Sequence, residues 1–243
     1  MSETFVKTPP RALLDPAKSG PFFAGMLLIA LISFWPSYLS KMGAQSAYTH
    51  LHAFLATCWI LMLIAQPMLI SNRRRDWHKA LGRISYGLAP AILVSMILLA
   101  HSRIVNIPAE RWPIRTYILW LQISLILVFA FSYAMAIVTR KDQAVHARFM
   151  MCTAFTLIDP ILIRLCFWIG PNPTFNYQWL TFGVTDLVIL ALIFAERHAR
   201  RGRWVFPAML VVFVLSQLPA VLQWTGASSW QAFAHWFQAL PLT

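Results

Sequence analysis

The sequence predicts an all-α integral membrane bundle of about seven transmembrane helices. Of its 243 residues, 59% are hydrophobic and only 12% are charged, whereas a soluble chain carries about 25% charged residues. Between Lys41 and Arg73 no Asp, Glu, Lys or Arg interrupts the chain, and a bilayer is crossed by roughly 20 apolar residues. Further runs of this kind follow, and the N-terminus is polar, so a single cleaved signal peptide does not explain the hydropathy.

The apolar runs are expected to be helical, because isolated strands cannot satisfy their backbone hydrogen bonds in lipid. The fifth span is the least regular, since Pro160 near its middle removes one backbone hydrogen bond and should kink the helix. Residues 103–115 form the largest outer connection, and their two prolines disfavour a fixed helix. The seven predicted spans are Pro21–Leu39, Leu51–Ile70, Leu81–Ala100, Thr116–Val138, Arg148–Ile169, Trp179–Ala195 and Trp204–Leu222.

The basic residues predict the orientation of these spans. Fifteen Lys and Arg residues fall in segments that alternate with segments holding only four, and Arg164 lies within a span. The positive-inside rule then places the N-terminus in the cytoplasm and the C-terminus outside. The net charge of +12 sits in short turns, so we attribute it to membrane orientation and expect the lipid bilayer, not nucleic acid, as the partner.

Three parts follow from this orientation. They are a cytoplasmic N-terminal segment (residues 1–20), a transmembrane domain of seven helices (residues 21–225) and an outer interfacial tail (residues 226–243). Aromatic side chains at helical spacing in the tail predict a short helix at the outer interface. A buried packing segment is the alternative.

The histidines near the span ends form two groups. His50 and His52 open the second span on the outer side, and His101 closes the third span on that side. His78 opens the third span and His146 the fifth, both on the inner side. Paired imidazoles from neighbouring helices are the axial ligands that b-type haem requires. Interfacial histidines that cap helix ends are the alternative.

The inner pair, His78 with His146, and the outer group, His101 with His50 or His52, are therefore candidate ligands of haem b, or of a single metal ion instead. Residues two apart point to different helix faces, so His50 and His52 are not expected to bind together. Arg83 and Arg148 follow the inner pair closely and would hold haem propionates through charge-assisted hydrogen bonds.

Three charged residues, Asp159, Arg164 and Asp186, lie inside predicted spans. A charge at bilayer depth costs about 2.5–3.5 kcal/mol on insertion scales, so it usually faces a partner and indicates function. Arg164 and Asp186 come from adjacent antiparallel spans at similar depth, which predicts a buried ion pair, functional or purely structural. Asp159 could form hydrogen bonds around the Pro160 kink.

A polar pocket open to the outer side is a further expectation. It would suit a proton-coupled site, a quinone or an anionic ligand. Its candidate lining is His52, His101, Gln122, Asp159, Arg164 and Asp186.

Two motifs in residues 48–168 resemble a family of uncharacterised bacterial polytopic membrane proteins. One is H-x-H-A followed, after a long span, by R-R-x-x-H-K-x-L-G-R-x-S-Y, and the other is H-A-R-F-M-M-C-T-A-F-T-L-I-D-P-I-L-I-R-L. The resemblance implies a shared fold and shared polar positions and supplies no reaction. The matching positions are His50 or His52, His78, Gly82, Arg83, His146, Arg148 and Arg164.

A weaker resemblance, to transmembrane di-haem b-type cytochromes, rests on histidines paired across four consecutive helices. In those proteins the ligands lie further inside the helices than here. The leading hypothesis is nevertheless a b-type cytochrome-like protein of the bacterial inner membrane, which would exchange electrons with a quinone or a redox protein.

Two alternatives remain at this stage. One is a small transporter, or a membrane subunit of a larger complex, that uses Asp159, Arg164 and Asp186 as an ion or proton relay. The other is a metal-dependent membrane hydrolase that uses the outer histidines and Asp186, although the H-E-x-x-H spacing of a zinc site is absent.

Overall fold

The computed structural model describes residues 16–170 and 175–243, and every regular element in these ranges is helical. This confirms the predicted all-α class; residues 1–15 of the predicted cytoplasmic segment lie outside these ranges. Short 3₁₀ turns occupy Pro16–Lys18, Leu39–Ala44, Ala109–Arg111 and Trp224–Gly226. The α-helices are α1 (Gly20–Phe34), α2 (Ala47–Ser71), α3 (Arg75–Ser102), α4 (Trp112–Val138), α5 (Gln143–Phe155), α6 (Ile158–Ile169), α7 (Tyr177–Ala195), α8 (Val205–Val221) and α9 (Ser228–Gln238).

Within the described residues, five segments are long and apolar enough to cross a membrane: Ala47–Ser71, Arg75–Ser102, Ala109–Val138, Gln143–Ile169 and Tyr177–Ala195. The helices α1 and α8 are also apolar but have only 15 and 17 residues. Large apolar side chains are exposed on the outward faces, for example Leu187 and Phe194 on α7. Such faces suit contact with lipid tails. The chain is therefore a multi-pass membrane protein by the length and composition of its helices.

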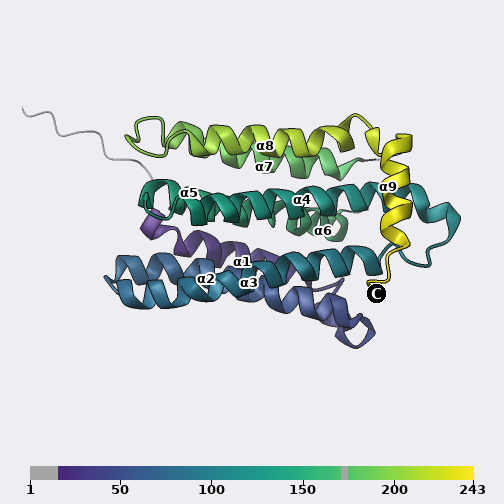
Figure 1. Ribbon diagram of the computed structural model, residues 1–243, viewed down its shortest axis with the longest axis horizontal. Coiled ribbons are helices and arrows are strands. Elements are labelled where there is room, and N and C mark those ends of the chain that lie inside the picture. The colour runs from purple at the N-terminus through teal and green to yellow at the C-terminus, as the bar shows by residue number, and fades with distance from the viewer. Residues whose placement is uncertain (1–15, 171–174) are drawn as a thin grey trace, which may run out of the picture.

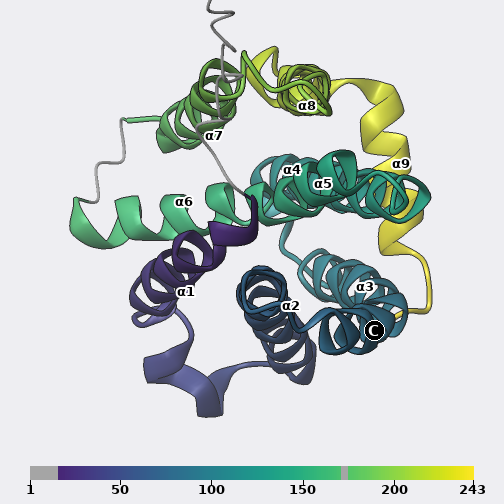
Figure 2. The same cartoon turned by 90° about the vertical axis from the view of Figure 1, so that its left-hand side faces the viewer.

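The helices pack in three layers, seen in both views (Figures 1 and 2). The middle layer contains α4, α5 and α6, and it lies between a layer of α1, α2 and α3 and a layer of α7 and α8. Within this arrangement α2 packs on α3, α3 on α4, α4 on α5, and α5 on α2. These four helices therefore form a closed ring, whereas α6 contacts α1 on one side and α7 on the other.

Aromatic packing fills the ring of α2–α5. Trp59 of α2 is 1% exposed, and its ring lies edge-on to Phe129 and Tyr133 of α4, with centroid distances of 5.1 and 5.6 Å. Its indole N–H donates to the Thr153 hydroxyl of α5 at 3.1 Å, so the buried polar end of the ring system is satisfied. A second buried core lies between the middle layer and α7–α8.

Local sequence sets the helix starts. Ser46 accepts the Thr49 N–H at the start of α2, and Asp142 accepts the N–H groups of Ala144 and Val145 at the start of α5, as expected of N-cap side chains. The α4 helix begins at Trp112, earlier than predicted, because a proline suits the first helical turn. The loop before α4, where no fixed helix was expected, contains the short 3₁₀ turn Ala109–Arg111.

The tail forms the predicted short helix, α9, which lies across one end of the bundle (Figure 1). The α2–α3 and α7–α8 connections lie at the opposite end. In α9, Ala234 and Phe237 are buried in a small core with α3 and α4, while Trp236 is exposed. The tail therefore combines the predicted helix with the alternative of a packed segment.

Candidate functional site

The fifth predicted span is broken in two. The α5 helix ends at Phe155 and α6 begins at Ile158, so the disturbance expected at Pro160 is confirmed and is stronger than a kink. In Figure 2 α5 is seen end-on while α6 runs across the view. The 13 residues of α5 rise about 20 Å, which is short of the roughly 30 Å hydrocarbon core. The α5 helix alone is therefore too short to cross a bilayer, and the break interrupts the apolar segment Gln143–Ile169.

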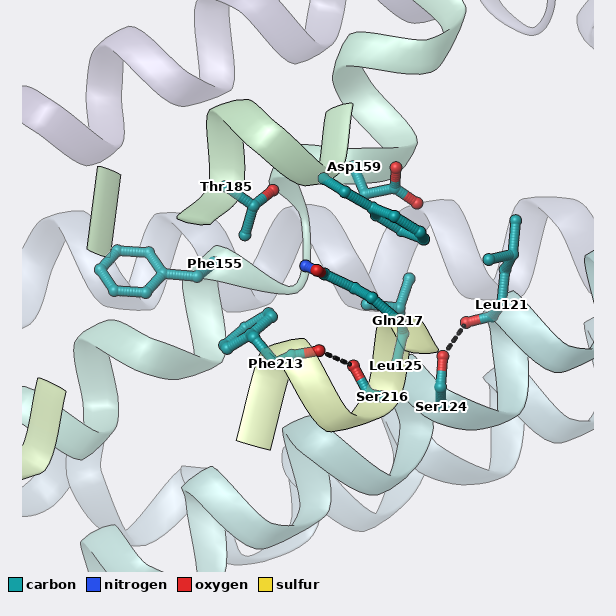
Figure 3. Close-up of a pocket in the computed structure, with 10 residues that line it drawn as sticks. Leu121, Ser124, Leu125, Phe155, Asp159, Thr185, Phe213, Ser216 and Gln217 are labelled. Atoms are coloured by element: carbon teal, nitrogen blue, oxygen red, sulfur yellow. Dashed lines mark hydrogen bonds between the residues drawn. The ribbon is translucent and has the colours of Figure 1, made fainter. Parts of the chain in front are cut away.

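A small cavity lies beside this break, between the middle layer and α7–α8 (Figure 3). Its volume of about 20 Å³ leaves room for roughly one water molecule. Five helices contribute to its wall, which combines apolar side chains with a carboxyl group, hydroxyl groups and an amide. The lining residues are Leu121, Ser124, Leu125, Phe155, Asp159, Phe182, Thr185, Phe213, Ser216 and Gln217.

Asp159 is the buried carboxyl group on the cavity wall, and it is only 8% exposed. Its Oδ1 accepts a hydrogen bond from Gln178 Nε2 at 2.5 Å and a second from the Thr181 hydroxyl. Both donors come from the start of α7, not from the Pro160 kink as expected. Its other oxygen, Oδ2, has no hydrogen bond among the described residues. A buried carboxyl group with one unused oxygen is costly unless something else contacts that oxygen.

Asp186 lies on the far side of Gln217. The Gln217 amide nitrogen donates to Asp186 Oδ1 at 3.1 Å, while Gln217 itself lines the cavity. Asp186 is half-buried and belongs to α7. One side chain therefore connects the cavity wall that carries Asp159 to the second carboxyl group predicted inside a span.

The predicted ion pair between Arg164 and Asp186 is wrong. Within residues 16–170 and 175–243 the ion pairs are Arg148–Glu196 and Arg201–Asp142. The Arg164 guanidinium instead donates to the Pro160 carbonyl at 2.7 Å and lies 4.4 Å from the centroid of the Phe34 ring on α1. Five residues on a helix rotate by about 140°, so Arg164 faces α1 while Asp159 faces α7. Asp186 faces α8.

The inner histidines lie on opposite members of the α2–α5 ring, since α3 carries His78 and α5 carries His146. They are near enough to interact electrostatically. The Nδ1 of His146 is 2.8 Å from the Ala136 carbonyl of α4, so it donates and leaves Nε2 with a free lone pair. Such a second hydrogen bond is typical of ligating imidazoles.

Two buried polar atoms at this end have no hydrogen-bond partner in the described chain. They are Nδ1 of His78 and Oε1 of Gln66. The Gln66 amide nitrogen donates to the backbone carbonyl of His78 at 3.3 Å, so the two residues are neighbours. At this end His78 thus has a buried Nδ1 without a partner and His146 has an Nε2 lone pair, from two different helices.

Neither of the two arginines expected to lie beside the inner histidines has a hydrogen bond to them in the described chain. Arg83 is exposed and has no hydrogen bond or ion pair within the described residues. Arg148 is 4% exposed, and its Nε donates to Glu196 Oε2 at 2.5 Å. Because Arg148 lies two positions after His146, it projects to a different face of α5, towards the α7–α8 connection. Arg148 is thus engaged with Glu196, and its role with haem propionates stays a prediction.

The outer histidines do not converge. His50 bonds Tyr38 at 2.9 Å, and His52 bonds Ser95 of α3 at 3.1 Å. His101 is fully buried, with Nδ1 at 2.6 Å from the Thr243 hydroxyl and its ring against Phe237. Ser95 and His101 differ by about 120° around α3, so His52 and His101 face different neighbours. The predicted outer haem pair is not formed.

The residues of the predicted outer polar pocket do not lie together either. Gln122 is half-buried and does not line the cavity, although its α4 neighbours Leu121 and Ser124 do. The single polar pocket expected from six residues is thus replaced by separate sites. In the part of the chain that the structure describes, no group of three or more His, Cys, Asp or Glu could hold a metal ion, so the geometry gives the hydrolase hypothesis no support.

Several residues of the cavity were not predicted from the sequence. Single serines, threonines and glutamines are common in apolar helices, where they often bond to their own backbone. One signal was present on α7, because Gln178, Thr181 and Thr185 follow each other at helical spacing and share a face. The other unpredicted polar residues of the site are Ser124, Ser216 and Gln217.

The fold and the cavity together define a class: a helical membrane protein with a broken helix and a polar cavity at the break. No protein-family model, curated protein or solved structure matches the chain.

Proposed function

We propose that this chain is a small ion-translocating membrane protein, either a transporter or the membrane subunit of a larger complex, with its ion path through Asp159 and Asp186. The observation that supports it most is the water-sized cavity at the α5–α6 break, which Asp159 lines and which Gln217 connects to Asp186. Broken helices beside intramembrane carboxyl groups are a recurrent way of building ion sites in transporters.

The helix order supports seven crossings as part of this proposal. The apolar helices alternate in direction along the long axis (Figure 1), and the two short ones, α1 and α8, complete the count with the five long spans. The basic α2–α3 and α7–α8 connections share one end of the bundle (Figure 1). By the positive-inside rule we place that end in the cytoplasm of a bacterial cell and α9 outside its inner membrane.

Within the site, each residue has a defined part. Gln178 and Thr181 hold Oδ1 of Asp159, so only Oδ2 is free to release or take a proton. A water molecule in the cavity can receive that proton, because the volume suffices for one. The Gln217 amide fixes Asp186 on the other side of the wall, which makes Asp186 the next group able to exchange a proton.

The test is proton flux in proteoliposomes that hold the purified protein and an internal pH-sensitive dye. After an imposed potassium diffusion potential, the wild-type protein should acidify or alkalinise the lumen faster than empty vesicles do. Asp159→Asn should abolish this difference, since an amide cannot exchange the proton. Glu110→Gln is the matched control, because Glu110 is an exposed acid in the 3₁₀ turn before α4 and far from the path.

Equal flux in wild-type and Asp159→Asn vesicles, at equal protein content and equal thermal stability, would remove the proposal. A loss of flux in Glu110→Gln as well would show that the signal does not depend on the cavity.

A second candidate function, electron transfer, is favoured by one specific observation. His78 and His146 lie on opposite helices of the α2–α5 ring, and His78 Nδ1 is buried without a partner. A haem held there would supply one-electron chemistry, while the helices would fix its axial ligands. An oxidised and a dithionite-reduced absorption spectrum tests this: a reduced α-band that weakens in His78→Ala supports it, and a colourless protein from haem-replete cells removes it.

A further inference from the structure

We propose that the cavity at the α5–α6 break is a binding site for a monovalent metal cation such as sodium. This inference rests on the proposed function and adds a second ion, besides the proton, that the same site would bind. The cavity is lined by oxygen atoms whose hydrogens are already used elsewhere, so they can only accept, and this is the chemistry that a cation requires.

The hydroxyl groups on the wall all donate to their own helices. Ser124 donates to the Leu121 carbonyl at 2.9 Å, and Ser216 donates to the Phe213 carbonyl at 2.7 Å (Figure 3). Thr185 donates to the Thr181 carbonyl at 2.9 Å. A hydroxyl group has one hydrogen and two lone pairs, so each of these oxygens presents only lone pairs to the cavity.

The amide of Gln217 is oriented in the same sense. Its nitrogen donates to Asp186, and a carboxylate accepts only from the nitrogen side of an amide. The Gln217 Oε1 is therefore left as an acceptor, and no hydrogen bond to it exists among the described residues. Together with Oδ2 of Asp159 and the three hydroxyl oxygens, it completes a set of acceptors from α4, α6, α7 and α8.

The helix break leaves another acceptor, next in sequence to Phe155 of the cavity wall. Pro160 has no N–H, so the carbonyl of Thr156, four residues earlier, loses its helical donor, and no other backbone N–H of the described chain bonds to it. Free carbonyl groups at the C-terminal end of a half-helix carry the negative end of its dipole. In discontinuous membrane helices such ends coordinate sodium ions or protons.

The size of the cavity and the identity of its lining select the occupant. At about 20 Å³ it holds one water-sized body. A water molecule has only two hydrogens to donate, fewer than the acceptor oxygens on this wall, and the second hydrogen of the Gln217 amide nitrogen is the donor left for its lone pairs. A dehydrated cation can be contacted by all the oxygens at once, and the negative charge of Asp159 offsets the cost of placing it at this depth.

One fixed positive charge, that of Arg164, is near enough to interact with Asp159 when no cation is bound. Arg164 and Asp159 interact electrostatically, but the guanidinium is held against Pro160 and Phe34 on the α1 side. It therefore compensates the carboxylate at a distance without blocking the cavity.

The test is thermal unfolding of the purified full chain in detergent, followed by intrinsic tryptophan fluorescence, in sodium chloride against choline chloride at equal ionic strength. Sodium should raise the Tm saturably, by about 3–5 °C for tight occupancy, and choline should not. Asp159→Asn should lose the response. Ser216→Ala should raise the half-saturating sodium concentration by about tenfold, the equivalent of one lost contact.

Ser102→Ala is the matched control, because Ser102 is also a serine that donates to its own helix, to Leu99 at 2.9 Å, but lies outside the cavity. It should keep the wild-type sodium response. If Asp159→Asn does not fold, Ser216→Ala and Thr185→Val decide the question. Equal Tm values in sodium and choline, or a sodium response that is unchanged in these cavity variants, would overturn the cation site.

The two proposals fail separately. Proton flux that depends on Asp159 without any sodium response overturns the cation site and leaves the ion path intact. A sodium response that depends on Asp159, in vesicles without Asp159-dependent flux, overturns the translocation function and leaves the binding site.

Discussion

Asp159 is a carboxyl group in an apolar surrounding, and its position depends on donors from a different helix. Thr181 is fully buried and donates to Asp159 Oδ1 next to Gln178. A hydrogen bond to a charged group contributes about 1.5–3 kcal/mol, and a buried acceptor that loses its donor is left with its desolvation cost. Removing the Thr181 hydroxyl group alone should therefore weaken the packing of α6 on α7 and lower the stability of the fold.

We expect Thr181→Val, which keeps the shape of the side chain and removes the hydroxyl group, to lower the free energy of unfolding by about 1–3 kcal/mol. Thermal unfolding in detergent measures the effect. Thr181→Ser is the matched control, since it keeps the hydroxyl group and removes only a methyl group, and should be the milder change. If Thr181→Ser proved the more harmful of the two, packing and not the hydrogen bond would hold this helix pair.

Arg148 and Glu196 make a second residue-scale case, at the inner end. Their side chains are 5% and 3% exposed with a 2.5 Å contact. Gly202, with φ +75°, lies so close that an added Cβ would be 2.9 Å from Arg148 Nη1. A buried ion pair is harmed most when one partner is left alone.

Arg148→Met should therefore lower the free energy of unfolding by about 3–5 kcal/mol, and adding Glu196→Gln should recover part of that loss. The exposed pair Arg201–Asp142, 75% and 31% exposed, provides the control. Arg201→Met should change the stability by less than about 1 kcal/mol. A double variant that is less stable than Arg148→Met would contradict the ion-pair explanation.

At the scale of elements, the α5–α6 break decides where the polar groups face. Pro160 stands at the start of α6, and the bend turns α6 across the bundle (Figure 2). A proline that stops one helix and begins another leaves an unpaired carbonyl at Thr156. In a membrane such a defect is tolerated where the backbone lines a polar cavity.

Replacing this proline separates stability from function. Pro160→Ala restores an N–H that can donate to Thr156, so we expect the Tm to stay equal or to rise, by an amount equivalent to about 1 kcal/mol. Because the cavity depends on the bend, the Asp159-dependent proton flux should fall. The same proteoliposome assay and unfolding curve measure both. A lower Tm with unchanged flux would mean that the bend is set by packing on α1 and α7 alone.

The break also marks the limit of prediction from the sequence. Helical class, the apolar segments and the disturbance at Pro160 could be predicted, because hydropathy and proline chemistry act locally. The Arg164–Asp186 pair could not be judged, since it assumed that α6 continues the axis of α5. The bend changes the direction in which every side chain of α6 points, and Arg164 therefore lies over the Phe34 ring of α1.

The cavity itself was beyond sequence reasoning for a different reason. Ser124, Ser216 and Gln217 are ordinary residues of apolar helices when taken singly. They become a site only because α4 and α8 meet α6 and α7 at one depth, and that meeting depends on long-range packing. The outer histidine group was misjudged for another reason, because His52 and His101 have different hydrogen-bond partners, Ser95 and Thr243.

At the scale of the whole molecule, the three layers divide the chain into two regions with different chemistry. The layer of α1–α3 carries His52 and His78, whereas Asp159 lines the cavity between the middle layer and α7–α8, and Asp186 belongs to α7. The α9 helix closes one end, where Gln231 accepts from the Trp112 indole at 2.6 Å and Gln238 donates to the Ile104 carbonyl at 3.0 Å. If ions pass along the second region, its ends must open to opposite sides of the membrane.

That requirement makes the number of crossings a direct test of the architecture. In a background with Cys58, Cys152 and Cys166 replaced by alanine, single cysteines at exposed positions report the side of the membrane. Lys141→Cys lies in the α4–α5 turn and Ser229→Cys in α9.

An impermeant maleimide added to spheroplasts should label Ser229→Cys at once and Lys141→Cys only after lysis, because the basic α4–α5 turn is retained in the cytoplasm. Between these two positions the chain would then cross an odd number of times, as α5–α6, α7 and α8 do if each traverses the bilayer. Labelling of both cysteines from the same side would mean that the bent α5–α6 segment re-enters without crossing, and Asp159 would then be reached from one side only.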